Sequence, residues 1–410
     1  DMFRPLSNLS KNKQVRVGMA AVAGVVLLGA IVSFIEIDWS FAFFAGSGDK
    51  KTNQEVAADS SDDSQADDTT PDSSTDSGSP PKALGEGIVE VGPAAKFKTI
   101  AAALKHARDN YEPRRRKSQL VIQVAGGKTY SERIVVDGSY PAGIRIVAKE
   151  GARPVLTSTD NQPLIKLDGV ERFSIEGFDL NAQGKSTAIE LAGYLTDCHL
   201  KDLKLSGFTG TGILANGAVG VGVYDQEIRL EHIELHAAGP KAVGMRFQQG
   251  TSDTSQVKVT DCRFHGPLLV GILLQNSPTF IAVRRSIFAE AKTGIKFDGS
   301  NMRLSNITVG NCTFFKLDRG IVFTSLPSTA SHSLKITRNV FSGLKGLDIV
   351  VENEFDSKTM FTMFSAAGRA TGWNWTSRAK PETSIVGEFD IVSHGGQIEA
   401  KIDFVSVDER

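Results

Sequence analysis

A short strand-like sequence motif recurs along residues 164–351, and it restricts the possible folds more than any other feature. Its last part is a small residue followed by an apolar-x-apolar step, which returns at intervals of about 23–32 residues. This part begins at Ala188, Gly212, Gly244, Gly271, Gly294, Gly320 and Gly346. An earlier part of the motif ends at Leu180, Leu205, Leu235, Phe264, Phe288, Phe314 and Phe341. Because one repeat is too short to bury its own apolar row, neighbouring repeats must stack and share a core.

Alternating apolar and polar residues predict short strands, and no helical segment separates them. This pattern predicts a parallel β-helix, in which each coil bonds to the next at a spacing of about 4.8 Å. We then expect Phe264, Phe288, Phe314 and Phe341 to form one internal stack, with Leu180, Leu205 and Leu235 below it. A leucine-rich repeat horseshoe fits less well, because its leucine-asparagine framework is missing. The 40 glycines and the hydrophobic content of 40% also suit a turn-rich all-β solenoid.

The three cysteines predict neither a disulfide nor a metal site. Cys262 and Cys312 occupy the same inward position two coils apart, about 9.6 Å at the usual coil spacing, which is too far for a disulfide. Cys198 falls in another part of its coil. The paired Cys or His spacing of a metal site is absent, so we expect buried free thiols and no cofactor.

The N-terminal segments predict a membrane anchor. Residues 17–35 carry no charge, and nineteen helical residues span about 28 Å, close to the thickness of a bilayer core. Basic residues precede this run and acidic residues follow it. The positive-inside rule therefore places residues 1–16 in the cytoplasm and the rest outside, in the periplasm or the extracellular space. A cleaved signal peptide is the alternative.

Residues 36–84 predict an interfacial segment followed by a disordered linker. The linker is rich in Ser, Asp and Thr and has almost no large apolar residue. Such a sequence buries too little surface to offset the entropy of ordering. We expect it to stay extended and to hold residues 85–352, the β-helix domain, away from the membrane.

The β-helix domain opens with a strand and an amphipathic helix. Residues 97–111 place apolar side chains on one helical face, and such a helix can cover the open end of a β-helix. Residues 120–124, 133–136 and 144–148 read as the next strands.

The stretch from Val89 to Val136 resembles the opening of pectin methylesterases and other proteins of the pectin-lyase-like right-handed β-helix superfamily. Those proteins share a capping helix and a strand pair, and the matching residues here are Phe97, Thr99, Ile100, Ala103, Gly127, Tyr130 and Glu132. The resemblance implies the right-handed form of the fold. It implies little about activity, because the matching residues are structural in the family.

Residues 353–410 differ in composition from the repeats and predict a C-terminal cap or final coils. Bulky apolar residues gather there, among them Trp373 and Trp375. These two indole rings are the candidate ligand-binding residues, as a platform on which a sugar ring stacks. Distal core packing is the alternative role.

No catalytic site emerges from the sequence. The acidic motifs of pectin methylesterases and the full motif set of polygalacturonases do not occur. The outward acids Asp179, Glu190, Glu234 and Asp298 lie on different repeats, so we expect them to be scattered on solvated faces. The histidines, among them His199, His232, His236 and His265, show no spacing typical of ligands or a triad.

The basic run at residues 114–117 lacks the interleaved aromatic residues of a nucleic-acid surface, so no nucleic-acid partner is expected. An anchored, stiff rod without visible chemistry suggests a non-catalytic sensor or binding module for polysaccharide or cell-envelope ligands. A carbohydrate-active enzyme with an unfamiliar site and a structural surface protein are the alternatives.

The layout also resembles membrane-bound Ser/Thr kinases of planctomycete-type bacteria. Those proteins combine a cytoplasmic kinase, one transmembrane helix and an external β-helix. Because Asp1 is not a start residue, the resemblance implies a kinase domain upstream. Within the 410 residues there is no kinase catalytic motif.

Overall fold

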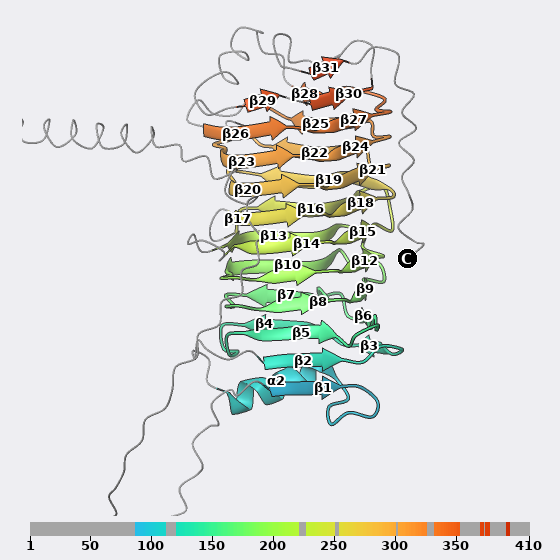
Figure 1. Ribbon diagram of the computed structural model, residues 1–410, viewed down its shortest axis with the longest axis vertical. Coiled ribbons are helices and arrows are strands. Elements are labelled where there is room, and N and C mark those ends of the chain that lie inside the picture. The colour runs from blue at the N-terminus through green and yellow to red at the C-terminus, as the bar shows by residue number, and fades with distance from the viewer. Residues whose placement is uncertain are drawn as a thin grey trace, which may run out of the picture. The chain divides into compact units, whose positions relative to one another are not determined.

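The computed structural model describes residues 87–111, 120–220, 227–250, 254–300, 302–325 and 332–352, with the short segments 370–372, 374–377 and 391–393. These residues form parallel strands wound into a solenoid with three faces. Figure 1 shows the strands stacked in chain order along one axis, from blue to red. All pairings of the described strands are parallel, and each joins one coil to the next or next but one.

Each coil from β2 to β28 contributes one strand to each face, in the order first, second, third. The first face contains β1 (Gly87–Val91), β2 (Leu120–Val124), β5 (Ile144–Ala148), β8 (Ser174–Glu176), β11 (His199–Lys201), β14 (Ile228–Glu231), β17 (Ser255–Thr260), β20 (Thr279–Arg284), β23 (Ser305–Gly310), β26 (His332–Thr337) and β29 (Ala370–Gly372). The second face contains β3 (Thr129–Ser131), β6 (Val155–Thr157), β9 (Asp179–Asn181), β12 (Lys204–Ser206), β15 (Glu234–His236), β18 (Arg263–His265), β21 (Ile287–Ala289), β24 (Thr313–Phe315), β27 (Val340–Ser342), β30 (Asn374–Thr376) and β31 (Ile391–Ser393). The third face contains β4 (Ile134–Asp137), β7 (Ile165–Asp168), β10 (Thr187–Tyr194), β13 (Thr211–Val219), β16 (Ala242–Gln248), β19 (Leu268–Gln275), β22 (Thr293–Asp298), β25 (Arg319–Phe323) and β28 (Ile349–Val351).

An internal aromatic column confirms the predicted stacking of the repeats. Phe264, Phe288, Phe314 and Phe341 stack with ring centroids 4.6, 4.9 and 4.8 Å apart and interplanar angles of 9°, 6° and 10°. Leu180, Leu205 and Leu235 continue the same register below them, as predicted. The column is buried, and the rings of Phe288 and Phe314 each stack on a ring of the coil above and of the coil below.

The recurring glycine of the third-face strands packs against this column. A Cβ at Gly294 would lie 2.5 Å from Cδ1 of Phe314, and one at Gly271 would lie 2.6 Å from Cδ1 of Phe288. Gly244 and Gly320 meet their Phe rings in the same way. The third face therefore approaches the aromatic rings more closely than any side chain permits.

A two-residue corner joins the first face to the second in the seven coils from β8 to β28. Its first residue has a positive φ and its second is buried; the first residues include Asp202 (φ 51°), His232 (φ 52°), Asp261 (φ 56°), Arg285 (φ 48°), Asn311 (φ 55°) and Arg338 (φ 59°). Asp, Asn and His tolerate this left-handed conformation better than most residues. The left-handed turn directs the first side chain outward at the same place in successive coils.

Helix α2 (Ile100–Asn110) is the predicted capping helix. Ile100, Ala103, Leu104 and Ala107 are buried in the core, beside β1 and β2. Figure 1 places the helix at the N-terminal end of the solenoid.

Three of the residues that carry the resemblance to pectin methylesterases form hydrogen bonds in or near this cap. The Thr99 hydroxyl accepts a hydrogen bond from Ala102 N. The carboxylate of Glu132 accepts bonds from the backbone N–H groups of Ile100 and Ala101, both at 2.8 Å. The hydroxyl of Tyr130 donates to the carbonyl of Ala125 at 2.9 Å. The contacts of Thr99 and Glu132 stabilise the helix N-terminus, and that of Tyr130 fixes the turn between β2 and β3, so the shared residues have structural roles.

Several predicted segments lie outside the described residues. They are residues 1–16, 17–35 and 36–84, and most of 353–410. In the part of the chain that the structure describes, no helix is both long enough and apolar enough to span a bilayer.

Candidate functional site

A row of charged side chains follows the corner between the first and second faces. The corner row consists of Asp202, His232, Asp261 and Arg285, each the outward residue of its corner. A second row, the strand row, consists of Asp179, Lys204, Glu234 and Arg263, which share one register at the start of the second-face strands. Because coils stack at about 4.8 Å, each row presents one charged or titratable group per coil.

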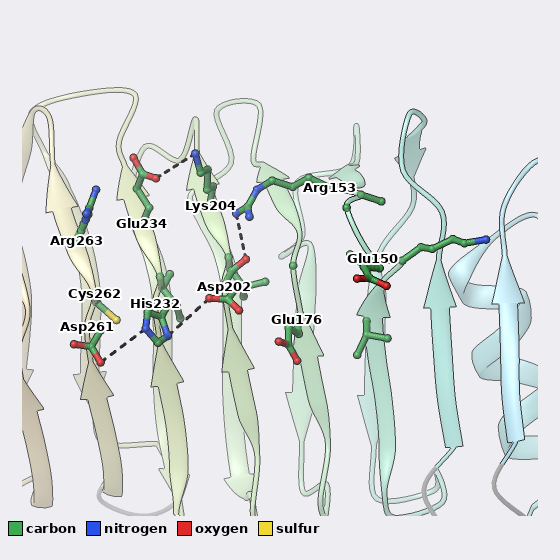
Figure 2. A pocket seen from close by; sticks show the side chains of 18 of the residues that line it. Glu150, Arg153, Glu176, Asp202, Lys204, His232, Glu234, Asp261, Cys262 and Arg263 are labelled. Atoms are coloured by element: carbon green, nitrogen blue, oxygen red, sulfur yellow. Dashed lines mark hydrogen bonds and ion pairs between the residues drawn. The ribbon is translucent and has the colours of Figure 1, made fainter. Parts of the chain in front are cut away.

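An open groove of about 890 Å³ runs along this corner. The corner row and most of the strand row line it, and the turn at residues 149–153 forms one end. Figure 2 shows His232 between Asp202 and Asp261, with Lys204 and Glu234 beside them. The other charged residues that line the groove are Arg145, Lys149, Glu150, Arg153 and Glu176.

The acids of the corner row have cationic partners. Arg285 makes two hydrogen bonds to the Asp261 carboxylate, at 2.9 and 2.7 Å. His232 lies between two carboxylates, with Nδ1 3.8 Å from Asp202 Oδ1 and Nε2 4.0 Å from Asp261 Oδ2. Lys201 on β11 lies 3.7 Å from Asp202.

The strand row is paired as well. Arg153 forms an ion pair with Asp179 and donates to the carbonyl of Asp202 at 3.1 Å. Lys204 lies 3.6 Å from Glu234. Arg263 forms no ion pair with any residue that the structure describes, so its guanidinium remains available to a ligand.

Two carboxyl groups of the groove have lowered pKa values. Hydrogen bonding and charge from Arg285 lower the pKa of Asp261 despite partial burial. Burial raises the pKa of Glu234, but the hydrogen bond from His265 and the charge of Lys204 outweigh it, so the pKa is lowered. Both groups are therefore ionised at neutral pH.

The Asp261–Arg285 pair predicts a pH-dependent contribution to stability. Since the folded-state pKa of Asp261 lies below its usual value of 3.8, the pair stabilises the fold above about pH 3.8. That contribution is lost as the pH falls through the lowered pKa. Arg285→Ala should therefore lower the thermal midpoint at pH 6, and its difference from the wild type should shrink toward pH 2.5. A difference that stays constant over this range, measured by circular dichroism, would contradict the assignment.

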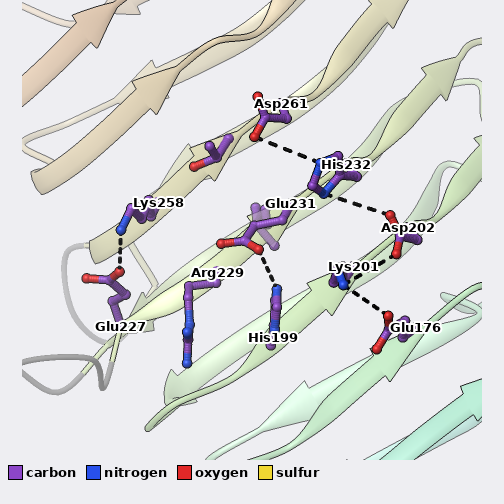
Figure 3. Close-up of polar contacts among 12 residues, drawn as sticks. Glu176, His199, Lys201, Asp202, Glu227, Arg229, Glu231, His232, Lys258 and Asp261 are labelled. Atoms are coloured by element: carbon purple, nitrogen blue, oxygen red, sulfur yellow. Dashed lines mark hydrogen bonds and ion pairs between the residues drawn. The ribbon is translucent and has the colours of Figure 1, made fainter. Parts of the chain in front are cut away.

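The first face carries further polar contacts beside the groove. Figure 3 shows His199 bonded to Glu231 and Lys201 bonded to Glu176, at 3.0 and 3.1 Å. Burial lowers the pKa of His199 although the charge of Glu231 opposes this, so the imidazole is neutral at pH 7. A smaller hollow of about 180 Å³ lies on this face and shares Arg145 and Glu176 with the groove.

The four outward acids lie apart from one another, as expected, but the expectation that Glu234 is isolated from other acids is wrong. Glu234 lies in the groove with Asp202 and Asp261, and Asp179 is in the same strand row. Glu190 and Asp298 lie on the third face, away from the groove. The missed residues, Asp202 and Asp261, carry a weak signal: a polar residue tolerant of left-handed backbone precedes each buried corner residue.

The histidines are also less isolated than expected. His232 joins two acids, and His236 and His265 occupy one register position on β15 and β18. Their spacing of 29 residues reflects one coil and is invisible as a ligand motif.

The cysteines are buried and free, as predicted. Burial raises the pKa of each of the Cys198, Cys262 and Cys312 thiols to about 12. They stay protonated and act as small core side chains. Among the described residues, no group of three or more His, Cys, Asp or Glu side chains is arranged to hold a metal ion.

The described residues do not test the predicted role of the two tryptophans. Trp373 lies outside the described residues. Trp375 belongs to β30 and pairs in register with Val340, but its side chain lies outside the described part. Their role as a sugar platform stays a prediction. The basic run at residues 114–117 also lies outside the described residues.

Comparison with known proteins agrees with the architecture. Residues 180–354 match the family model "Right handed beta helix region". None of the curated proteins matches the sequence.

Several solved structures are similar at low identity. A pectin methylesterase from Aspergillus niger is 11% identical, with 78% of this chain and 88% of that chain covered and a TM-score of 0.33. Pectate lyase Pel9A is 12% identical, with 74% of this chain and 78% of that chain covered and a TM-score of 0.43. An alginate lyase from Paenibacillus sp. is 13% identical, with 76% of this chain and 95% of that chain covered and a TM-score of 0.36.

The stacked parallel faces, the capping helix and the matched family model lead to one assignment. The chain contains a right-handed parallel β-helix, whose residues 180–354 match the family model of that fold.

Proposed function

We propose that this β-helix is a non-catalytic module that binds polysaccharide along the corner groove. The observation that carries the proposal is the repetition of charged and hydrogen-bonding side chains, coil after coil, in one open groove. A linear polymer offers the same kinds of group at regular intervals along its length. Arginine in the groove suits recognition of carboxylates or hydroxyl groups, since its planar guanidinium donates several hydrogen bonds.

The electrostatics favour binding over acid–base chemistry. A general acid for glycoside cleavage needs a carboxyl group with a raised pKa. In the groove, the pKa values of Asp261 and Glu234 are lowered, and their oxygens are held by Arg285 and His265. These carboxylates hold the side chains of the groove in place.

Substitution of the free arginine tests the binding proposal. The full chain should bind at least one polymer in a panel of neutral and uronic-acid polysaccharides. Arg263→Ala should weaken that binding about tenfold, or about 1.4 kcal/mol, because it removes a charged donor without breaking an ion pair. Binding is measured by affinity electrophoresis or calorimetry.

The matched control is Lys241→Ala. Lys241 is also exposed but lies outside the groove, before β16. Equal affinity in the wild type and Arg263→Ala would place the binding surface elsewhere, and the absence of binding to every polymer would contradict the proposal.

A second candidate function, a carbohydrate-active enzyme, is favoured by one observation. Three acids and two arginines converge in the groove: Asp202, Glu234, Asp261, Arg263 and Arg285. Such an enzyme would release oligosaccharides or methanol from the bound polymer, whereas a binding module leaves it intact.

The proposal includes anchoring through residues 17–35, with the β-helix outside the cytoplasm. It is supported by the uncharged run and its flanking charges in the sequence. In this arrangement the β-helix acts as the sensing part of a membrane protein, and a Ser/Thr kinase upstream would receive the signal. Protease protection in intact cells tests the orientation, and sequencing of the upstream reading frame tests the kinase link.

A further inference from the structure

Two imidazoles on neighbouring coils lie on the outer surface of the second face. His236 ends β15 and His265 ends β18, and the strand register places them side by side. Their Nδ1 atoms are 3.3 Å apart, and the ring centroids are 5.0 Å apart with a tilt of 49°. Each ring therefore turns the same nitrogen toward the space between them.

We propose that His236 and His265 bind a late divalent transition metal such as Zn²⁺ through their two Nδ1 atoms. In a tetrahedral site with Zn–N bonds of about 2.0–2.1 Å, two ligand nitrogens lie about 3.3 Å apart. Imidazole nitrogen is a preferred ligand of zinc, copper and nickel. The remaining coordination positions are open to water or to an external ligand.

Glu234 fixes the tautomer that metal binding needs. Its Oε1 lies 2.9 Å from Nε2 of His265. An ionised carboxylate only accepts, so Nε2 of His265 carries the proton and its Nδ1 lone pair points toward His236. A carboxylate behind a ligating histidine is the usual support of such sites.

The backbone beside the pair holds one ring in position. Gly266 has a φ of +84°, and a Cβ there would lie 2.8 Å from Cε1 and Nδ1 of His236. The His236 ring therefore packs directly over the chain that follows His265. Two positive groups, Lys204 and Arg263, share this outer surface, and Lys204 lies 3.6 Å from Glu234.

In the metal-free chain the same geometry forms a hydrogen bond. The proton of His265 is on Nε2, where it is donated in the hydrogen bond to Glu234. The Nδ1 atom of His265 can then only accept, so Nδ1 of His236 must be the donor between the two rings. Metal binding therefore requires the His236 proton to move from Nδ1 to Nε2, so that both neutral rings direct an Nδ1 lone pair at the metal and no net proton is released.

Calorimetric titration of the chelator-treated full chain with Zn²⁺ tests the site. We expect saturable binding of one Zn²⁺ that is lost, or at least tenfold weaker, in His236→Gln and in His265→Gln. Mg²⁺ should not compete, because it prefers oxygen ligands. Glu234→Ala should weaken binding about 10- to 100-fold through loss of orientation.

His199→Gln is the matched control. His199 also bonds a carboxylate, Glu231, but no second imidazole of the described residues lies against it, so its substitution should leave zinc affinity unchanged. Circular dichroism at each titration confirms that the variants are folded. No saturable binding by the wild type, or wild-type affinity in both histidine variants, would overturn the site. Unchanged affinity in Glu234→Ala would overturn the role of that carboxylate.

Discussion

Replacing Phe288 with Ala should lower the free energy of unfolding by about 4 kcal/mol. Phe288 is fully buried, and its ring stacks between Phe264 and Phe314 at 4.6 and 4.9 Å. Its removal leaves a cavity in the middle of the column and exposes two neighbouring rings to the void, so both burial and stacking are lost. Urea denaturation followed by far-ultraviolet circular dichroism measures the loss.

Phe280→Ala is the control for this substitution. Phe280 lies on β20 of the same coil but is 53% exposed, so its truncation should change stability by no more than about 0.5 kcal/mol. Equal losses in the two variants would mean that the aromatic column does not hold the coils together.

Gly294→Ala should destabilise the fold by about 1–3 kcal/mol, although it adds only one methyl group. The new Cβ would lie 2.5 Å from Cδ1 of Phe314 and 2.8 Å from the carbonyl oxygen of Gly320. The ring sits inside the stacked column and the carbonyl belongs to the backbone of the next coil, so neither can move without disturbing a neighbour.

Two further variants separate crowding from a general effect of alanine. Gly239→Ala places a Cβ where no atom lies within 4 Å, and stability should be unchanged or slightly increased. Gly294→Ala combined with Phe314→Leu should lose less than the sum of the single losses, because the smaller side chain leaves room for the methyl group. Strict additivity would contradict a clash with the ring.

Most of the fold could be predicted because the repeat reports directly on packing. Phe264 and Phe288 recur at the inward position of successive coils, and alternation alone places them in one column. The helix at residues 97–111 could be predicted for the same reason, since its apolar face has helical spacing. The structure narrows it to Ile100–Asn110 and explains Glu132, which accepts bonds from the helix N-terminus.

The groove could not be predicted in the same way, because its residues become neighbours only through the winding of the coils. Asp202, His232 and Asp261 are about 30 residues apart in sequence, and each reads as a solvated turn residue. What brings them together is the left-handed backbone shared by successive corners, which no hydrophobic pattern reports. The pairing of His236 with His265 could not be predicted for the same reason, although their strand register makes them adjacent.

The fate of the bound polymer is the most direct test of the proposed function. The full chain is incubated with each polysaccharide that it binds, and the length of the polymer and the released products are measured by size-exclusion chromatography and mass spectrometry. We expect saturable binding that Arg263→Ala weakens, with the polymer recovered at its original length and no ester group released. New chain ends or released methanol that depend on Asp261 or Glu234 would contradict a non-catalytic module and make the groove an active site.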